Sequence, residues 1–334
     1  MLLADAEASA AADAEEEQIP EAPAQPVTRP GDIWCIAGHH LICGDCRDRG
    51  IVNRLLGGVK ANLVITSPPY ATQREHDPES GFTPVPPEAY CGWFRVVAAN
   101  IAAVLTPDGS YFLNTKEHAE GGRRSLYVKD LVVAHVRQWG WWCIDELCWR
   151  KPMTACRVDG GIASRMPGSR SSISPFQRRG SSFGPRRSGM SPRTVLGTRR
   201  TTRNRTREVV SSPFPRALVE FFVKAFSDPG DIAFDAFLGS ASSIAAAAVL
   251  DRVGYGIEIS PAYCDVAVHR IANLTGEEPV LAETGQAMAE VAAERGVPME
   301  QVENPRLRDA RRIRHKGVAP FYGSRRSSAG PTPS

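Results

Sequence analysis

Short apolar segments and amphipathic segments alternate along most of this 334-residue chain. Between residues 49 and 151 the pattern predicts helix 49–58, strand 62–66, helix 88–105, strand 110–114, helix 125–139 and strand 141–151. Strands separated by helices are typical of a parallel sheet with helices on both faces. The chain is therefore expected to have an α/β fold built on a doubly wound, mostly parallel sheet.

The same alternation resumes after residue 208. It predicts helix 215–226, strand 231–237, helix 240–250, strand 254–259, helix 261–273 and a last amphipathic helix at 281–295. Ahead of the first helix, residues 32–35 and 40–43 predict a short hairpin. A hydrophobic fraction of 42% is ordinary for a globular protein and sufficient for a large core.

The two ends of the chain differ in composition from these segments. Residues 1–30 are rich in Ala, Glu and Pro, so we expect a disordered acidic lead-in. Residues 276–334 are expected to contain the last helix and then a basic, disordered tail. The domain itself is predicted to span 31–275, interrupted by an Arg/Ser-rich segment at 155–208.

Positive charge is concentrated in that segment. Residues 155–207 contain thirteen Arg and one acid, a local charge of +12, so the rest of a chain with net charge +3 carries −9. The segment has three interpretations. It is a basic DNA-recognition region that orders on phosphates, a disordered insertion, or the product of a local frameshift, and we favour the frameshift.

The frameshift hypothesis rests on codon degeneracy. If the last nucleotide of each codon is read with the first two of the next, Arg165–Ser174 can encode Asn-Ala-Trp-Glu-Pro-Ile-Phe-His-Phe. Residues 189–204 likewise permit an ordinary protein sequence, and the single codons of Met166 and Met190 fit both. Such a shift opens near 152–164 and closes near 204–212, and it makes the basic run an accident of the reading frame.

The expectations for cellular location and metal content rest on motifs that we do not find in the sequence. No apolar run is long enough to span a membrane, and we recognise no secretory signal, so a cytoplasmic protein is the default expectation. The eight cysteines are scattered. Cys43 and Cys46 have metal-ligand spacing but lack a second such pair, so reduced structural thiols are favoured over zinc and no metal site is predicted.

Two strand ends carry candidate ligand-binding loops. The first, Thr66-Ser67-Pro68-Pro69-Tyr70, is a stiff loop with hydrogen-bond acceptors and an aromatic face, which suits a planar base with an amino group. The second, Asp235–Ser240, closes a strand and opens a helix, and Gly239 there permits close approach of a ligand. Glu258, nineteen residues later, ends the next strand where an acid can accept from ribose hydroxyls.

These residues together resemble the amino-methylating DNA methyltransferases of the β arrangement, over roughly 31–151 and 209–275. The resemblance implies a sheet of the S-adenosylmethionine-dependent type and methyl transfer to an exocyclic amine of a flipped base in double-stranded DNA. A serine at the first loop position favours cytosine N4 over adenine N6. The resemblance assigns the base to Ser67, Pro68, Pro69 and Tyr70, and the cofactor S-adenosylmethionine to Asp45, Thr66, Phe214, Pro215, Asp235, Phe237, Gly239, Ser240 and Glu258.

One residue departs from the family pattern at the cofactor turn. Ala241 stands where the family has a glycine, so cofactor affinity is expected to suffer if the backbone φ there is positive. The alternatives to an active DNA methyltransferase are a catalytically inactive DNA-binding remnant and an enzyme that methylates RNA or protein amines. The family also allows for a cognate restriction endonuclease as a partner; the oligomeric state and the target sequence are not predicted.

Overall fold

The computed structural model describes residues 19–69, 82–116, 119–120, 123–150, 170–178 and 216–298. Its strands are β1 Ile33–Ile36, β2 His39–Cys43, β3 Ala61–Thr66, β4 Leu105–Thr115, β5 Ala119–Glu120, β6 Arg123–Arg124, β7 Trp141–Cys143, β8 Leu147–Arg150, β9 Arg170–Arg178, β10 Ile232–Asp235, β11 Val253–Glu258 and β12 Val280–Leu281. Its helices are α2 Arg49–Leu56, α3 Tyr90–Val104, α4 Tyr127–Arg137, α5 Arg216–Phe226, α6 Ser242–Val249, α7 Pro261–Thr275 and α8 Met288–Arg295.

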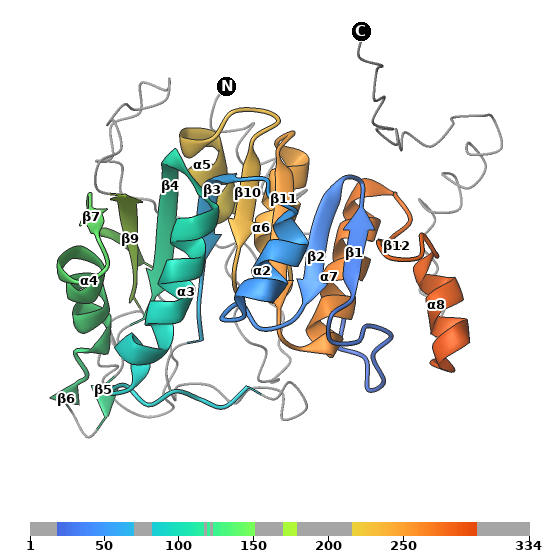
Figure 1. The fold of residues 1–334 in the computed structure, drawn as a ribbon, viewed down its shortest axis with the longest axis horizontal. Helices are drawn as coiled ribbons and strands as arrows, with labels where there is room; N and C mark the ends of the chain where they lie inside the picture. The colour runs from blue at the N-terminus through green and yellow to red at the C-terminus, as the bar shows by residue number, and fades with distance from the viewer. Residues whose placement is uncertain are drawn as a thin grey trace, which may run out of the picture.

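A single large sheet organises these elements (Figure 1). Its strand order is β12-β1-β2-β11-β10-β3-β4-β9-β7, with β8 also paired to β9. The five central strands, from β2 to β4, pair in parallel, whereas β1, β9 and β12 pair with their neighbours in antiparallel fashion. The predicted doubly wound, mostly parallel α/β fold is confirmed.

Helices cover both faces of this sheet, and the alternation of side chains along the strands explains how. Val64 faces the core that α2, α3 and α4 cover, whereas Leu63 and Ile65 face α5. A third cluster packs α6, α7 and α8 against β1 and β2. Strands buried on both faces need near-continuous apolar sequence, which is what residues 63–65 supply.

The start of the packed chain lies ahead of the predicted boundary at Gly31. Val27 and Thr28 are buried, and their backbone N–H groups donate to the carboxylate of Asp265 on α7, at 2.6 and 3.0 Å. Trp34 Nε1 donates to the hydroxyl of Thr28 at 2.8 Å. Val27 and Thr28, which the sequence assigned to the disordered lead-in, are therefore packed against the domain, because their backbone N–H groups bind a carboxylate far along the chain.

Two further sequence expectations differ from the structure. The predicted strand 141–151 is divided into β7 and β8, and β9 lies between β7 and β4. The predicted helix 281–295 begins only at Met288, because Gly285, with φ of +72°, makes a turn that lets β12 pair with β1. Within the expected Arg/Ser-rich segment, residues 170–178 are strand β9; the rest of 155–208 lies outside the described residues.

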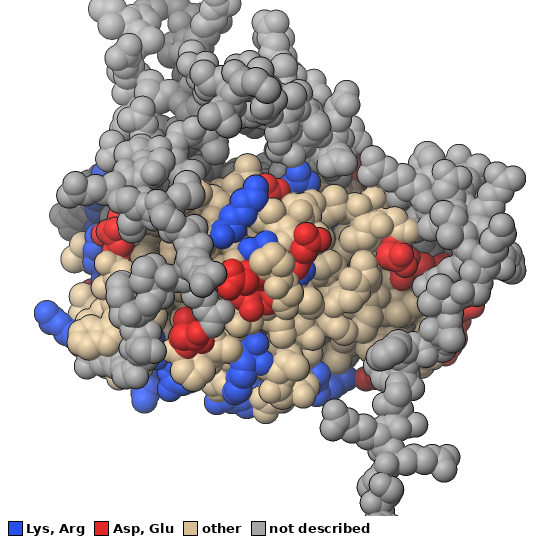
Figure 2. Space-filling view, turned by 90° about the horizontal axis from the view of Figure 1, so that it is seen from above, with Lys and Arg blue, Asp and Glu red and all other residues tan. Residues whose placement is uncertain are grey.

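Charged side chains of both signs are interspersed on the uncovered part of the face seen from above (Figure 2). That face includes the end of the sheet where the central parallel strands begin. Among the described residues, no helix is long and apolar enough to cross a membrane. Within the same ranges, no group of three or more His, Cys, Asp or Glu side chains is arranged to hold a metal ion.

Candidate functional site

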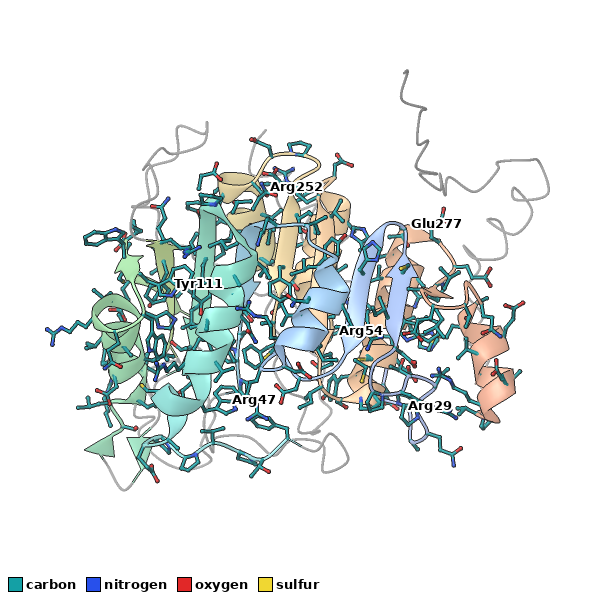
Figure 3. The ribbon with its side chains drawn as sticks, viewed as in Figure 1. Arg29, Arg47, Arg54, Tyr111, Arg252 and Glu277 are labelled. Atoms are coloured by element: carbon teal, nitrogen blue, oxygen red, sulfur yellow. The ribbon has the colours of Figure 1, made fainter. Side chains whose placement is uncertain are left out.

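The central parallel strands end at one edge of the sheet. In Figure 3, Arg47, just past the carboxyl end of β2, lies at the lower edge, and Arg252, which immediately precedes β11, lies at the upper edge. The carboxyl ends of β2, β11, β10 and β3 therefore share the lower edge. Open α/β sheets bind ligands outside this end of their strands.

The loop after β3 is held by two neighbouring elements. Asn114, near the end of β4, donates from Nδ2 to the hydroxyl oxygen of Ser67 at 3.0 Å. Tyr90, at the start of α3, donates its hydroxyl to the carbonyl oxygen of Pro69 at 2.6 Å. Pro68 is buried and Ser67 is half-buried. Tyr70, which the sequence places in the same loop, lies outside the described residues.

A buried hydrogen bond joins this loop to the second candidate turn. Thr66 Oγ1 donates to Asp235 Oδ1 at 2.8 Å, and the backbone N–H of Phe237 donates to the same carboxylate oxygen at 3.0 Å. Burial raises the pKa of Asp235, and these two donors act in the opposite direction. Because β3 and β10 are parallel neighbours, the two turns predicted from distant parts of the sequence lie next to each other.

The turn after β10 is anchored to the end of β11. The backbone N–H of Gly239 donates to Glu258 Oε2 at 2.7 Å, and Ser260 N donates to the other carboxylate oxygen at 2.9 Å. Burial raises the pKa of Glu258. Gly239 has φ of +53°, and a Cβ built there would meet no described atom within 4 Å. The backbone therefore faces open space at the position where the sequence predicted close approach of a ligand.

Ala241 adopts the left-handed conformation, which is the condition under which a loss of cofactor affinity is expected. Its φ is +63° and its exposed fraction is 0%. Its methyl group belongs to the core cluster with Leu238 and Ile244, so it does not point toward the ligand side of the turn. The cost of the substitution is thus backbone strain of about 1 kcal/mol relative to glycine, and no steric block follows from it.

Asp45 lies at the same edge, beyond β2. The backbone N–H of the preceding Gly44 donates to the carbonyl oxygen of Glu258 at 2.8 Å, which places the two strand ends side by side. The Asp45 carboxylate forms an ion pair with Arg47, at 2.6 Å, and both side chains are partly exposed. Three acids, Asp45, Asp235 and Glu258, therefore stand at the ends of three neighbouring strands.

Aromatic side chains of α3 pack beside the second turn. Phe237 lies with its ring centroid 5.8 Å from Trp93 and 6.3 Å from Phe94. Tyr90, whose hydroxyl holds Pro69, lies 5.2 Å from Trp93 by the same measure. The two candidate loops thus share one aromatic support.

The described residues of both predicted loops lie at this edge, together with three residues that the sequence did not single out. Asn114 and Tyr90 hold the first loop, and Arg270 of α7 donates to Ser240 in the second turn. A signal existed for Asn114, a polar residue at the end of a strand beside the predicted site. Thr66 is completely buried, and its hydroxyl donates a hydrogen bond to the Asp235 carboxylate. Phe214 and Pro215 lie outside the described residues.

Comparison with known proteins identifies the family. The model of the N6/N4 DNA methylase family matches residues 61–186 and 185–269. The chain belongs to this family. Because the matched ranges include both candidate loops, the family assignment and the geometry concern the same part of the molecule.

Two relatives show how far the sequence similarity extends. The type II methyltransferase M.XycI of Xanthomonas campestris pv. cyanopsidis is 25% identical over 285 residues, 73% of this chain and 91% of that protein. The orphan methyltransferase M.BamHII of Bacillus amyloliquefaciens is 43% identical over 60 residues, 18% of this chain and 23% of the relative. A local match to M.MwoI of Methanothermobacter wolfeii spans 15% of that relative, so some of these similarities are confined to short segments.

Solved structures share the fold. The PvuII DNA methyltransferase, described as cytosine-N4-specific, superposes with a TM-score of 0.54 at 18% identity, over 77% of this chain and 91% of that one. A putative DNA modification methylase from Thermus thermophilus, solved with S-adenosyl-L-methionine, superposes with a TM-score of 0.51 at 22% identity, over 75% of this chain and 96% of that one. The strand arrangement is thus that of known methyltransferases.

Proposed function

We propose that this chain is an S-adenosylmethionine-dependent DNA methyltransferase that methylates an exocyclic amine of a flipped base, cytosine N4 in preference to adenine N6. One observation carries the proposal. The hydrogen bond between Thr66 and Asp235 fastens the Ser67–Pro69 loop to the Asp235–Gly239 turn at the carboxyl edge of the sheet. A base site and a cofactor site then lie side by side, as methyl transfer requires.

The residues at this edge fit the cofactor. S-adenosylmethionine supplies an electrophilic methyl group when bound. Gly239 leaves its backbone open to a ligand, and the Glu258 carboxylate keeps lone pairs for ribose hydroxyls beyond the two N–H groups it already accepts. Asp45 is suited to the adenine amine, and Phe237 adds an apolar face. Thr66 acts through Asp235, and the roles expected of Phe214 and Pro215 stay predictions.

The first loop would make the target amine a better nucleophile. The hydroxyl oxygen of Ser67 and nearby loop carbonyls accept hydrogen bonds from the amine, which draws electron density onto its nitrogen. Asn114 holds the Ser67 hydroxyl and Tyr90 holds the Pro69 carbonyl, so these acceptors are preorganised. Tyr70, at the end of the loop, is proposed to stack on the flipped base.

The proposed macromolecular substrate is double-stranded DNA. Support comes from the family and from the basic residues of 155–207, which suit a phosphate backbone if the reading frame is authentic. A companion restriction endonuclease is an expectation from the family alone. A chain that binds DNA but transfers no methyl group is the second candidate, favoured by the left-handed alanine in the cofactor turn.

The test is transfer of labelled methyl groups from S-adenosylmethionine to unmethylated DNA, followed by nucleoside analysis. We expect label in N4-methylcytosine with the wild-type chain and none with Ser67→Ala. Label in N6-methyladenine would contradict the base preference alone. A wild-type chain that binds DNA and S-adenosylmethionine but leaves DNA, RNA and protein unlabelled would contradict the proposed activity.

A further inference from the structure

A buried arginine from α7 reaches the proposed cofactor turn. Arg270 is 7% exposed, and its Nη1 donates to the carbonyl oxygen of Ser240 at 2.7 Å. The same nitrogen lies 3.3 Å from Ser240 Oγ and 3.1 Å from Ser242 Oγ. One guanidinium thus binds Ser240, the last residue of the turn, and Ser242, the first residue of α6.

The turn that Arg270 contacts has an unusual backbone. Gly239 and Ala241 both have positive φ, and only Ser240 separates them. Glycine adopts this conformation freely, but alanine does not, because its Cβ crowds the following carbonyl oxygen. Ala241 must therefore be held in place by contacts elsewhere, since its own preference opposes the turn.

The anchors of the turn lie on two sides. Gly239 is fixed by the Glu258 carboxylate at the end of β11, and Ser240 is fixed by Arg270 on the side of α7. A charge-assisted hydrogen bond is stronger than a neutral one, and a buried guanidinium that loses its acceptors is costly. The contact therefore opposes rotation of the Ser240 peptide, which is the movement that would relax Ala241.

We propose that Arg270 is a positioning residue for S-adenosylmethionine, because it holds the strained Gly239–Ser242 turn in the conformation that exposes Gly239 to the cofactor. The inference rests on the proposed function. In this account the contact from Arg270 offsets the strain that an alanine, in place of the family's glycine, introduces at residue 241. Arg270 itself touches neither the cofactor nor the base in this account.

The experiment is calorimetric titration of the full chain with S-adenosylmethionine. The variants are Arg270→Met, Arg270→Lys, Ala241→Gly and the double variant Arg270→Met/Ala241→Gly. Arg252→Met is the matched control. Arg252 is half-buried, whereas Arg270 is buried, but it likewise donates to backbone carbonyls, those of Leu250 and Ser227, at the opposite edge of the sheet (Figure 3).

We expect Arg270→Met to raise the dissociation constant about tenfold or more, the scale of one charge-assisted contact. Arg270→Lys should raise it about two- to fivefold, because an ammonium can reach Ser240 but lacks the geometry of the guanidinium. In the Arg270→Met background, Ala241→Gly should recover about threefold or more, whereas in the wild-type background it should change affinity less than about twofold. Arg252→Met should lower thermal stability and leave the dissociation constant unchanged.

Three results would overturn the inference. They are wild-type affinity in folded Arg270→Met or Arg270→Lys, an Ala241→Gly effect that is the same in both backgrounds, and an equal loss of affinity in Arg252→Met. The lysine variant, which keeps the charge, decides the matter if the methionine variant does not fold. A wild-type chain that does not bind S-adenosylmethionine would contradict the proposed function itself, which distinguishes that failure from failure of Arg270 alone.

Discussion

Thr66 and Asp235 lie 169 positions apart in the chain, and their side chains share a buried hydrogen bond of 2.8 Å. The acceptor is a carboxylate that is 5% exposed, so each donor to it has a large effect on its ionised form. At the scale of single residues, this hydrogen bond joins the loop after β3 to the turn after β10.

Substitution of Thr66 tests this contact. Thr66→Val keeps the shape of the side chain but leaves the Asp235 carboxylate with one donor fewer, so we expect a loss of about 2 kcal/mol in the free energy of unfolding, measured by urea at pH 7. The matched control is Thr106→Val. The hydroxyl of Thr106 is buried and has no hydrogen-bond partner among the described residues, so its loss should be neutral within about 0.5 kcal/mol. Equal costs for the two variants would contradict the role of the bond.

Some site residues could be predicted from sequence and others could not, for a physical reason. Gly239 and Ala241 stand in a motif whose backbone geometry is local, so the sequence could single out Ala241 as a position where a positive φ would matter. Arg270 and Tyr90 contact the two turns from other elements, and their positions in the sequence do not indicate these contacts. An arginine or tyrosine on an amphipathic helix resembles any other until the helix is docked.

At the scale of elements, β9 is the least expected part of the sheet. It lies in the Arg/Ser-rich segment, yet it pairs with β4, β7 and β8. Ile173 and Phe176 point into the two cores on opposite faces, and Phe176 stacks on His135 with ring centroids 4.3 Å apart. Two apolar residues at positions i and i+3 among serines give no strand period, so this element could not be predicted from the pattern.

The contribution of β9 can be measured directly. Phe176→Ala should cost about 3–5 kcal/mol in the free energy of unfolding, because a ring that is 1% exposed is removed from the core. Val133→Ala, on the exposed side of α4, serves as the control and should cost less than about 1 kcal/mol. A neutral Phe176→Ala would show that the segment does not contribute to the folded domain.

The frameshift hypothesis for 155–208 is still a prediction, and the coding DNA across residues 150–215 decides it. The elements before and after the segment could be predicted because their apolar periods are strong. The strand that pairs with β7 could not be predicted. The helix before a strand indicates the direction of that strand, but its partner depends on pairing with residues far away in the chain.

At the scale of the whole molecule, two buried histidines contribute to the response to acid. Burial lowers the pKa of both His39 and His135 from 6.5 to about 4. The unfolded chain therefore binds more protons between pH 6.5 and about 4, so stability is lost as the pH falls through this window. Asp235, Glu258 and Asp265, whose pKa values burial raises, act with the opposite sign in the acid range.

A difference measurement separates these contributions. His135→Phe removes one histidine from an aromatic environment that accepts another ring. Between pH 7 and pH 5 we expect the variant to lose about 2 kcal/mol less stability than the wild type, since 1.5 pH units below the unfolded pKa correspond to about that much. Parallel pH profiles in urea unfolding would contradict the neutral, buried state of His135.

Hydrogen exchange with and without S-adenosylmethionine tests most directly whether the two turns form one cofactor-facing edge. The account predicts that the cofactor slows exchange together in peptides covering 63–69, 236–245 and 258–264, and leaves 228–232 and 250–253, at the opposite edge, unchanged. Slowed exchange in only one of the two turns, or at the opposite edge, would contradict the account.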